Sequence, residues 1–441
     1  MRTRRPWKPC AANGRPSSTP PRPGRPLSLR LYGLATRLAS PFAPLLLARR
    51  ARRGKEDAGR LAERLGKASR PRPGGSVVWL HAVSVGESVS LLPLIQRLAQ
   101  ARPDVALLVT SGTRTSAQIL QARLPSGAIH QYAPVDTPGA VAAFLDHWRP
   151  ALGVFVESEL WPNLLLAARD RGVRLALVSA RMTQASARAW AARPKAAAAV
   201  LGAFELILPQ DDDTARRLAA LGARIDGRLN LKRVGEPLAA DPAEQARLGA
   251  QIGGRPVIVA ASTHPGEEAI IAAAVGTLRD PPLLIIVPRH PERRDQILAD
   301  LPGRRIAVRS RQAPIAADTQ IYLADTMGEL GLFIRLADLV LMGGGFTGDV
   351  GGHNPLEPAR LGKPVAAGED AANFKAIYAE MAAAGAALQV SVAALPDVLR
   401  RLMDDESIRT RMGEAALAYA SRQGAEFDGA LDRLLAMAPA P

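Results

Sequence analysis

Acidic side chains stand at two points where a parallel sheet would present them to a ligand. Glu87 follows an apolar run at 77–80, and a helical pattern begins directly after it. A carboxylate at such a junction points into the crevice at the carboxyl edge of the sheet, where Glu87 could act as a general base toward an attacking hydroxyl. A capping role in the first turn of the helix suits the same residue, and the residues alone leave both interpretations open.

A second acidic pair, Glu157 and Glu159, follows the apolar run at 152–156. We expect these two side chains, which are separated by one residue, to point in different directions, so that only one of them faces the crevice. The pair therefore supplies one further candidate carboxylate at the same edge of the sheet.

The chain is richest in glycine between the apolar run at 339–342 and a helical pattern that begins near Pro355. The glycines at 343–345, 351 and 352 leave room for backbone N–H groups to approach an anion. Asn354 suits the N-cap of the helix, and Glu357, one turn further on, could accept a hydrogen bond from a sugar hydroxyl. A glycine-rich turn without a ligand explains the same residues and is the alternative.

Hydrogen-bond donors follow two further apolar runs in the second half of the chain. Arg289 and His290 come after one of these runs and could hold a phosphate. Met327, Gly328 and Glu329 form a loop before a helical pattern, suited to backbone contact with a base. Each segment taken alone is better explained as a surface loop, but their shared position after predicted strands favours a common site.

Composition and motifs exclude several functional classes. The six histidines form no HExxH motif or other close metal pair, so no metal site is predicted. Cys10 is the only cysteine, which rules out an internal disulfide. No P-loop or GxGxxG dinucleotide motif occurs, and an aromatic content of 4% argues against base-stacking platforms for nucleic acid. We therefore expect neither a bound cofactor nor a nucleic-acid partner.

The elements that would position these residues alternate along the chain. Apolar runs separated by helical patterns predict an α/β fold of two Rossmann-like domains that face one another across a cleft. Regular patterning breaks down around Gly235 and Pro237, so we place the first domain at 56–235, a linker at 236–254 and the second domain at 255–441. Strands are predicted at 77–80, 105–109, 152–156, 174–178, 204–208, 256–260, 283–287, 305–308, 320–323, 339–342 and 364–366.

Positive charge is concentrated at the N-terminus. The formal net charge is +16, yet residues 1–55 hold fourteen Lys or Arg and no acid, which leaves 43 basic against 41 acidic residues elsewhere. Residues 1–26 form a Pro- and Arg-rich tail that is predicted to be disordered. Residues 27–55 are apolar but broken by arginines and prolines, which favours a membrane-associating segment that lies in the plane of the membrane surface. A signal peptide is the competing interpretation.

Several phrases of the sequence resemble, in the right order, the signatures of one family: the 3-deoxy-D-manno-octulosonic acid (Kdo) transferases of lipopolysaccharide synthesis. The resemblance extends from about residue 28 to near the C-terminus. The phrases are His81-Ala-Val-Ser-Val-Gly-Glu87, Val156-Glu-Ser-Glu-Leu-Trp-Pro-Asn163, Ser179-Ala-Arg181, Pro288-Arg-His-Pro-Glu-Arg293, Met327-Gly-Glu-Leu330 and Gly351-Gly-His-Asn-Pro-Leu-Glu-Pro-Ala359.

The resemblance implies an inverting GT-B glycosyltransferase that moves Kdo from CMP-Kdo to a lipid A precursor, a tetraacyl disaccharide bisphosphate. It implies that Glu87 is the general base and that Glu157 and Lys232 help to stabilise the transition state. The implied location is the cytoplasmic face of the inner membrane of a Gram-negative cell, with monotopic or peripheral attachment. The residues implied to bind the CMP part of the donor are Arg289, His290, Met327, Gly328, Glu329, Asn354, Pro355, Leu356 and Glu357.

The sequence departs from the family pattern at one place, and two other functions stay open. Many relatives carry Gly-Pro-His where this chain has Gly368-Glu-Asp370, which puts any contact of that histidine in doubt. A GT-B transferase that uses a UDP-sugar would share the same fold. A non-catalytic protein that binds polyanions through residues 1–55 is the alternative from another class.

Overall fold

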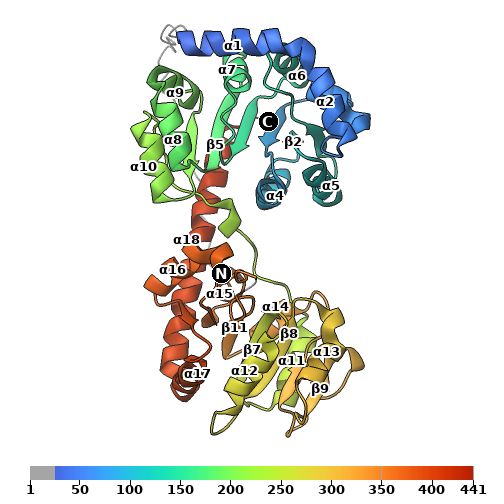
Figure 1. The fold of residues 1–441 in the computed structure, drawn as a ribbon, viewed down its shortest axis with the longest axis vertical. Coiled ribbons are helices and arrows are strands. Elements are labelled where there is room, and N and C mark those ends of the chain that lie inside the picture. Colours follow the sequence, from blue (N-terminus) through green and yellow to red (C-terminus); the bar gives the residue numbers. More distant parts are fainter. Residues whose placement is uncertain (1–24, 349, 441) are drawn as a thin grey trace, which may run out of the picture.

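The computed structural model describes residues 25–348 and 350–440, so most of the predicted tail lies outside the described residues. Two domains follow one another along the long axis of the molecule (Figure 1), and each is built on a parallel β-sheet. Helices alternate with the strands in both domains. This architecture confirms the predicted α/β fold class with two Rossmann-like domains.

The first sheet has six parallel strands in the order β3-β2-β1-β4-β5-β6. Along β1, Val78 and Leu80 pack on one face of the sheet while Val77 and Trp79 pack on the other, because helices cover both faces. The strand order reverses between β1 and β4, where sheets of this kind bind ligands. The elements are β1 (Val77–His81), α4 (Val85–Ala101), β2 (Ala106–Ser111), α5 (Arg114–Arg123), β3 (Ile129–Tyr132), α6 (Pro138–Trp148), β4 (Leu152–Val156), α7 (Pro162–Asp170), β5 (Arg174–Ala180), α8 (Gln184–Ala191), α9 (Pro194–Leu201), β6 (Leu206–Pro209) and α10 (Asp212–Ala220).

The second sheet has seven parallel strands in the order β13-β12-β11-β7-β8-β10-β9, and its order reverses between β7 and β11. Side chains of β7 alternate between two cores in the same way as those of β1. The elements are β7 (Val257–Thr263), α12 (Glu267–Gly276), β8 (Leu283–Pro288), α13 (Arg294–Asp300), β9 (Ile306–Val308), β10 (Ile321–Leu323), α14 (Leu330–Leu336), β11 (Leu339–Met342), α15 (Leu356–Ala359), β12 (Val365–Gly368), α16 (Lys375–Ala383), β13 (Ala387–Val390) and α17 (Leu395–Asp404).

Two strands, β3 and β13, were not predicted. Each lies at an edge of its sheet, where one side of the strand has no neighbour. The sequence Ile-His-Gln-Tyr of β3 is half polar, and the two central residues of β13 are exposed. These two edge strands therefore lack the continuous apolar run that marks the central strands.

The domains are joined by the segment around η3 (Leu231–Arg233) and by α18 (Glu406–Met437). Within the predicted linker 236–254, residues 242–252 form α11 (Pro242–Ile252), whose Leu248 and Ile252 lie in the core of the second domain. Helix α18 runs back to the first domain (Figure 1), where its last turns, including Phe427 and Leu434, complete a core beneath the first sheet. The C-terminal residues thus belong to the packing of both domains.

The N-terminal segment forms α1 (Leu27–Ala39), a 3-10 turn, and α2 (Ala43–Arg52), followed by α3 (Leu61–Arg64). Residues 27–52 are long and apolar enough to span a membrane by length and composition. In the described structure α1 instead lies across the end of the first domain (Figure 1). Two hydrogen bonds hold it there: Tyr32 to Asp136 at 2.9 Å, and Asn163 to Thr36 at 2.9 Å.

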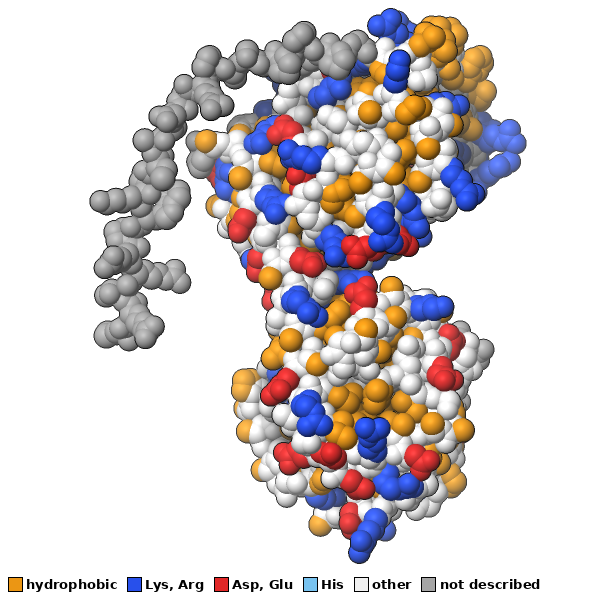
Figure 2. Space-filling model, turned by 90° about the vertical axis from the view of Figure 1, so that its left-hand side faces the viewer, with side chains coloured by type: hydrophobic (Ala, Val, Ile, Leu, Met, Phe, Trp, Pro, Cys, Tyr) orange, Lys and Arg blue, Asp and Glu red, His pale blue; other side chains and the backbone are white. Residues whose placement is uncertain are grey.

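The outer face of this segment carries large apolar side chains. Leu27 and Leu38 are 72% and 68% exposed, and Phe42 is 69% exposed. Figure 2 shows hydrophobic side chains gathered at this outer end of the first domain, with Lys and Arg side chains beside them. The exposed set, spaced to lie along one side of the helices, is Leu27, Leu31, Leu34, Leu38, Phe42, Leu45 and Leu46.

Candidate active site

Glu87 lies in the first turn of α4, just beyond the end of β1. Its carboxylate accepts hydrogen bonds from the Val83 N–H and the Ser84 hydroxyl, both at 2.8 Å, and the Glu87 N–H donates to the Ser84 oxygen at 3.3 Å. Glu87 therefore does cap the helix, as one of the two interpretations held. Capping leaves lone pairs on both carboxylate oxygens, so it orients a base without blocking it.

Glu157 is the first residue after β4 and forms a salt bridge with Lys232, whose Nζ lies 2.6 Å from Oε1. The φ angle of Glu157 is 55°, a left-handed conformation that costs a non-glycine residue about 1–3 kcal/mol. Lys232 approaches from η3, which is held by a hydrogen bond from the Leu231 N–H to the Ser179 hydroxyl at 3.3 Å. Glu157 is buried, whereas about half of the Lys232 side chain is exposed, so the ammonium stays accessible to a ligand.

Glu159 lies close enough to Glu87 and Glu157 to feel both charges. Burial raises the pKa of Glu159 to about 7, the two neighbouring carboxylates add to the shift, and a hydrogen bond from the Trp161 indole N–H opposes it. The two acids have different partners, because Glu157 pairs with Lys232 whereas Glu159 accepts the indole N–H of Trp161. The backbone between them is not extended, since Glu157 is left-handed.

In the second domain, positive and histidine side chains gather at the carboxyl ends of β7, β8 and β11. The rings of His264 and His353 are stacked 5.1 Å apart with their Nε2 atoms 2.8 Å from each other, and His290 lies edge-on to His264. Burial and the positive charges of His264, Arg289 and His290 lower the pKa of His353 to about 4. The same positive potential would stabilise an anion bound here.

Glu357, in the single turn of α15, lies close enough to Arg289 to feel its charge. Burial raises its pKa, and the positive charges of neighbouring arginines, Arg289 among them, oppose the shift. Asn354 begins the turn, because its Oδ1 accepts the Leu356 N–H at 3.1 Å. Pro355 and Leu356 are buried, so these two position the backbone and offer no exposed side chain.

Two expectations about the glycine-rich loop were wrong in detail. Helix α15 is a single turn of four residues, so its dipole is small. The N–H groups of Gly344 and Phe346 are not free for an anion, because they donate to the carboxylate of Glu267 at 2.8 and 2.9 Å. Glycine at 343 serves close packing, since a Cβ there would lie 2.6 Å from the carbonyl oxygen of Ser262.

Glu267 and Glu268 were not among the predicted site residues, yet they shape the loops of the second domain. Both are buried in the first turn of α12. Glu268 accepts the Thr263 hydroxyl at 2.8 Å and pairs with Arg293 at 2.8 Å, which fixes the loops after β7 and β8. The sequence did carry a signal, since two acids open an otherwise apolar helix. Carboxylates buried at such a position require several hydrogen-bond donors, and the neighbouring loops must supply them.

Met327, Gly328 and Glu329 follow β10, which neighbours β8. Met327 is largely exposed and Gly328 has a φ of 85°. Glu329 forms a salt bridge with Arg309 at 2.6 Å, and that contact lowers the pKa of the carboxyl. The carboxylate is thus engaged within the protein, while the backbone of the loop remains open to a ligand.

The departure from the family pattern at 368–370 lies against the glycine-rich loop. A Cβ at Gly368 would lie 1.9 Å from the Gly345 carbonyl oxygen, and the Asp370 N–H donates to that oxygen at 3.3 Å. The two loops are therefore packed backbone to backbone, and Glu369 and Asp370 leave that packing intact.

Arg233, the residue after Lys232, ties the two domains together. Its guanidinium donates to Glu380 of α16 at 2.7 Å and to the hydroxyl of Tyr419 in α18 at 3.0 Å. Arg360, at the end of α15, donates to the Arg233 carbonyl oxygen at 2.7 Å. Two neighbouring residues of η3 thus contact different domains. Lys232 pairs with Glu157 of the first domain, and Arg233 contacts helices α16 and α18.

Comparisons with known proteins agree on one family. The family model described as "3-Deoxy-D-manno-octulosonic-acid transferase (kdotransferase)" matches residues 59–234. The chain is 35% identical over 426 residues to the 3-deoxy-D-manno-octulosonic acid transferase of Bordetella pertussis, covering 92% of this chain and 98% of that protein.

Two solved structures were also compared with the chain. A glycosyltransferase from Rickettsia africae covers 83% of this chain and 99% of its own at 10% identity with a TM-score of 0.50, in keeping with the GT-B fold. The C-terminal CMP-Kdo binding domain of WaaA from Acinetobacter baumannii is 32% identical over 40% of this chain and 94% of its own, with a TM-score of 0.37. From the sequence relationship over nearly its whole length, the chain belongs to the 3-deoxy-D-manno-octulosonic acid transferase family of glycosyltransferases.

Proposed function

We propose that this Kdo transferase uses CMP-Kdo as donor and an acylated, phosphorylated glucosamine disaccharide of the lipid A precursor type as acceptor, with inversion at the anomeric carbon. The observation that carries the proposal is the pairing of two complementary clusters. Carboxylates and a lysine lie at the end of the first sheet, and histidines with an arginine lie at the end of the second. The first suits proton removal and the second suits a phosphate.

In the proposed reaction the acceptor hydroxyl gives its proton to Glu87 and attacks the anomeric carbon of Kdo. The bond from that carbon to the phosphate oxygen breaks, and CMP leaves with the electron pair. One displacement of this kind inverts the anomeric carbon. The hydrogen bonds from Val83 and Ser84 support the assignment, because they orient the Glu87 carboxylate before any substrate arrives.

Lys232 and Glu157 are proposed to stabilise the transition state. The buried Glu157 carboxylate holds the Lys232 ammonium in place, and the exposed part of the lysine can meet negative charge as it develops on the leaving group. The ammonium is held by a salt bridge and by the fold of η3, so it requires little reorganisation during the reaction.

The nucleotide is proposed to bind the second domain, predicted at 255–441, and the acceptor the first, predicted at 56–235. Arg289 and His290 would meet the phosphate, and the Arg289 guanidinium forms no salt bridge with any described residue. The exposed backbone of Met327 and Gly328 would meet the base. The remaining proposed contacts come from Glu329, Asn354, Pro355, Leu356 and Glu357.

Membrane attachment is proposed to occur through α1 and α2, in the plane of the cytoplasmic surface of the inner membrane. The leucine-bearing face is exposed while the opposite face is hydrogen-bonded to the first domain. Basic residues at the end of α2, Arg49, Arg50 and Arg52, would meet anionic headgroups. A helix docked in this way places the acceptor domain at the lipid surface.

Transfer of Kdo from CMP-Kdo, generated in situ, to a lipid A precursor tests the proposal. Mass spectrometry of the lipid should show a gain of one or more Kdo units with the native enzyme and none with Glu87→Ala. Protection against thermal unfolding by CMP, with none from UDP, would separate this donor from a UDP-sugar. A folded native enzyme that yields no product would overturn the donor and acceptor assignment.

A further inference from the structure

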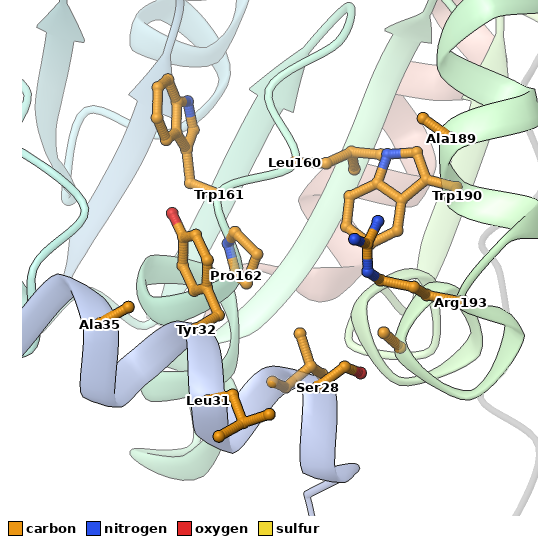
Figure 3. A pocket seen from close by; sticks show the side chains of 12 residues that line it. Ser28, Leu31, Tyr32, Ala35, Leu160, Trp161, Pro162, Ala189, Trp190 and Arg193 are labelled. Atoms are coloured by element: carbon orange, nitrogen blue, oxygen red, sulfur yellow. The ribbon is translucent and has the colours of Figure 1, made fainter.

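A cavity of about 740 Å3 lies between α1 and the helices α8 and α9 (Figure 3). Leu29 and Tyr32 of α1 form one wall, Trp161 lies at the start of α7, and Trp190 faces them from α8. The volume falls in the range of roughly 300–1,000 Å3 that is typical of small-ligand sites. Its walls come from three segments far apart in sequence, so the fold must be complete before the cavity exists.

The lining of the cavity is mostly apolar, and two of its polar groups are already engaged. The Tyr32 hydroxyl donates to Asp136, and the indole N–H of Trp161 donates to Glu159. Arg193, at the rim, is the one charged side chain among the described residues that line it. A sugar would need several free hydrogen-bonding partners here, whereas a hydrocarbon chain needs none.

One side of the cavity is continuous with the exposed leucine face of α1. Leu31 lines the cavity and is also 57% exposed, next to Leu27 and Leu34 on the same face. A row of exposed leucines on a helix is typical of contact with lipid. A hydrocarbon chain could therefore pass from the lipid surface into the cavity without crossing polar protein surface.

The other side of the cavity adjoins the carboxylates. Trp161 is hydrogen-bonded to Glu159, and Glu159 in turn feels the charges of Glu87 and Glu157. A molecule that fills the cavity would thus have its apolar end toward the lipid surface and its other end near the proposed base. An amphiphile whose polar end carries the reacting hydroxyl matches that arrangement.

We propose that this cavity binds one acyl chain of the lipid acceptor and thereby holds the acceptor hydroxyl near Glu87. The inference rests on the proposed function, because it takes the acceptor to be an acylated sugar phosphate. The occupant is a chain of the acceptor itself, held by apolar contact with Trp190 and Leu29. Arg193 lies where an anionic group of the same molecule would leave the cavity.

The first test blocks the cavity and compares two acceptors. Ala189 lines the cavity from α8 and is exposed, so Ala189→Phe places a ring in the space without disturbing the core. Ala191→Phe is the matched control, since it is exposed on the same helix and does not line the cavity. The acceptors are the acylated disaccharide phosphate and the same disaccharide after chemical removal of its acyl chains.

The Ala189→Phe variant should raise the KM for the acylated acceptor at least tenfold, because each methylene expelled costs about fourfold in affinity. Its KM for the deacylated acceptor and for CMP-Kdo should equal those of the native enzyme and of Ala191→Phe. Equal KM values for the acylated acceptor in all three proteins would overturn the proposal. A parallel loss with the deacylated acceptor would assign the cavity to the sugar. If even the native enzyme transferred no Kdo, the proposed function would fail instead.

A second test needs no turnover. Acceptor whose acyl chains carry bromine should quench the fluorescence of Trp190, and the quenched part of the emission should fall in Trp190→Phe. Vesicles of phosphatidylglycerol with the same brominated chains, without acceptor, should leave the Trp190 emission unchanged. Quenching of Trp190 by the vesicles alone would mean that a bilayer lipid occupies the cavity, and that outcome contradicts the proposal.

Discussion

The carboxylate cluster of the first domain and the histidine–arginine cluster of the second hold their charges in opposite ways. Glu87 and Glu157 are buried and fixed by backbone N–H, hydroxyl and ammonium groups, at the cost of a strained backbone. Arg289 and His290 are exposed. The buried groups around them are those of the glycine-rich loop and Glu267, whose carboxylate accepts an N–H of that loop. We infer from this difference that the first cluster serves a role that requires fixed geometry, whereas the second serves one that requires charge.

That contrast separates two kinds of effect. Loss of a fixed group at the reacting atoms should lower kcat, because the transition state loses more than the ground state. Loss of an exposed cation at the nucleotide should weaken donor binding and leave kcat at saturation nearly unchanged. Variants of the two clusters can therefore test whether the two differ in this way.

The largest effect is expected from Glu87→Gln. The amide keeps the shape of the side chain and can still accept a hydrogen bond, but it cannot take a proton, so kcat should fall about 10²–10⁴-fold. Initial rates at saturating substrates measure the loss, and calorimetry with CMP should find unchanged affinity. Ser84→Ala is the control: it removes a capping hydroxyl, costs about 1 kcal/mol of stability and keeps the carboxylate. Equal losses of activity in both variants would mean that Glu87 serves only as a helix cap.

Replacement of Lys232 by methionine should have the next largest effect. Removal of the positive charge at the leaving group is expected to lower kcat by about 10²-fold, since a preorganised donor of this kind contributes about that much. Single-turnover rates with saturating donor provide the measurement. Lys195→Met removes an exposed lysine of α9 and should leave the rate unchanged. A Lys232→Met enzyme with the native kcat would show that the lysine takes no part in the reaction.

Arg289→Ala tests the second cluster. Charge-assisted hydrogen bonds contribute about 1.5–3 kcal/mol, so the affinity for CMP should fall about 10–100-fold while kcat at saturating donor changes little. Isothermal calorimetry with CMP and steady-state kinetics together distinguish these quantities. The control is Arg279→Ala, which removes an exposed arginine outside the cluster. A fall in kcat with unchanged affinity would contradict the division of labour between the domains.

The smallest expected effect is on stability and concerns Glu159, whose pKa is raised to about 7 by burial and by its acidic neighbours. Because the folded protein holds this proton more tightly than the unfolded chain, the stabilising contribution is complete below about pH 4.5 and is lost as the pH rises through 7. Urea unfolding should therefore show Glu159→Gln gaining on the order of 1 kcal/mol relative to the native protein between pH 5 and pH 7.5.

Glu414→Gln, an exposed carboxylate of α18, is the matched control for that pH series. It should follow the native protein at every pH. If Glu159→Gln also followed the native protein, the carboxyl would already be ionised at pH 5, and the three carboxylates could not lie as close as described.

The sequence was sufficient for the parts of the fold that depend on local pattern. Central strands such as β7 and β11 are continuous apolar runs because helices cover both of their faces, and they were predicted within a few residues. The edge strands β3 and β13 have no such run and were missed. The family resemblance supplied the site residues in both domains, which remain predictions of function.

Long-range contacts were beyond the reach of sequence patterns. No spacing rule connects Lys232 to Glu157, or Glu267 to the N–H groups of the glycine-rich loop, because each pair is brought together by the sheet. The left-handed backbone of Glu157 could not be predicted either, because the side-chain type of a glutamate does not indicate it. Backbone conformation and tertiary contact thus determine what the motifs alone left open.

Helix α18 has a consequence for how the chain is made. Phe427, Leu431 and Leu434 complete a core of the first domain, although the strands of the second domain lie between them and the first sheet in the sequence. During synthesis the first domain therefore emerges early, and its core stays incomplete, with an apolar groove uncovered, until α18 has been made. Nascent chains that stop short of this helix should require chaperones to stay soluble, and premature termination near residue 420 should yield aggregated protein in place of a free acceptor domain.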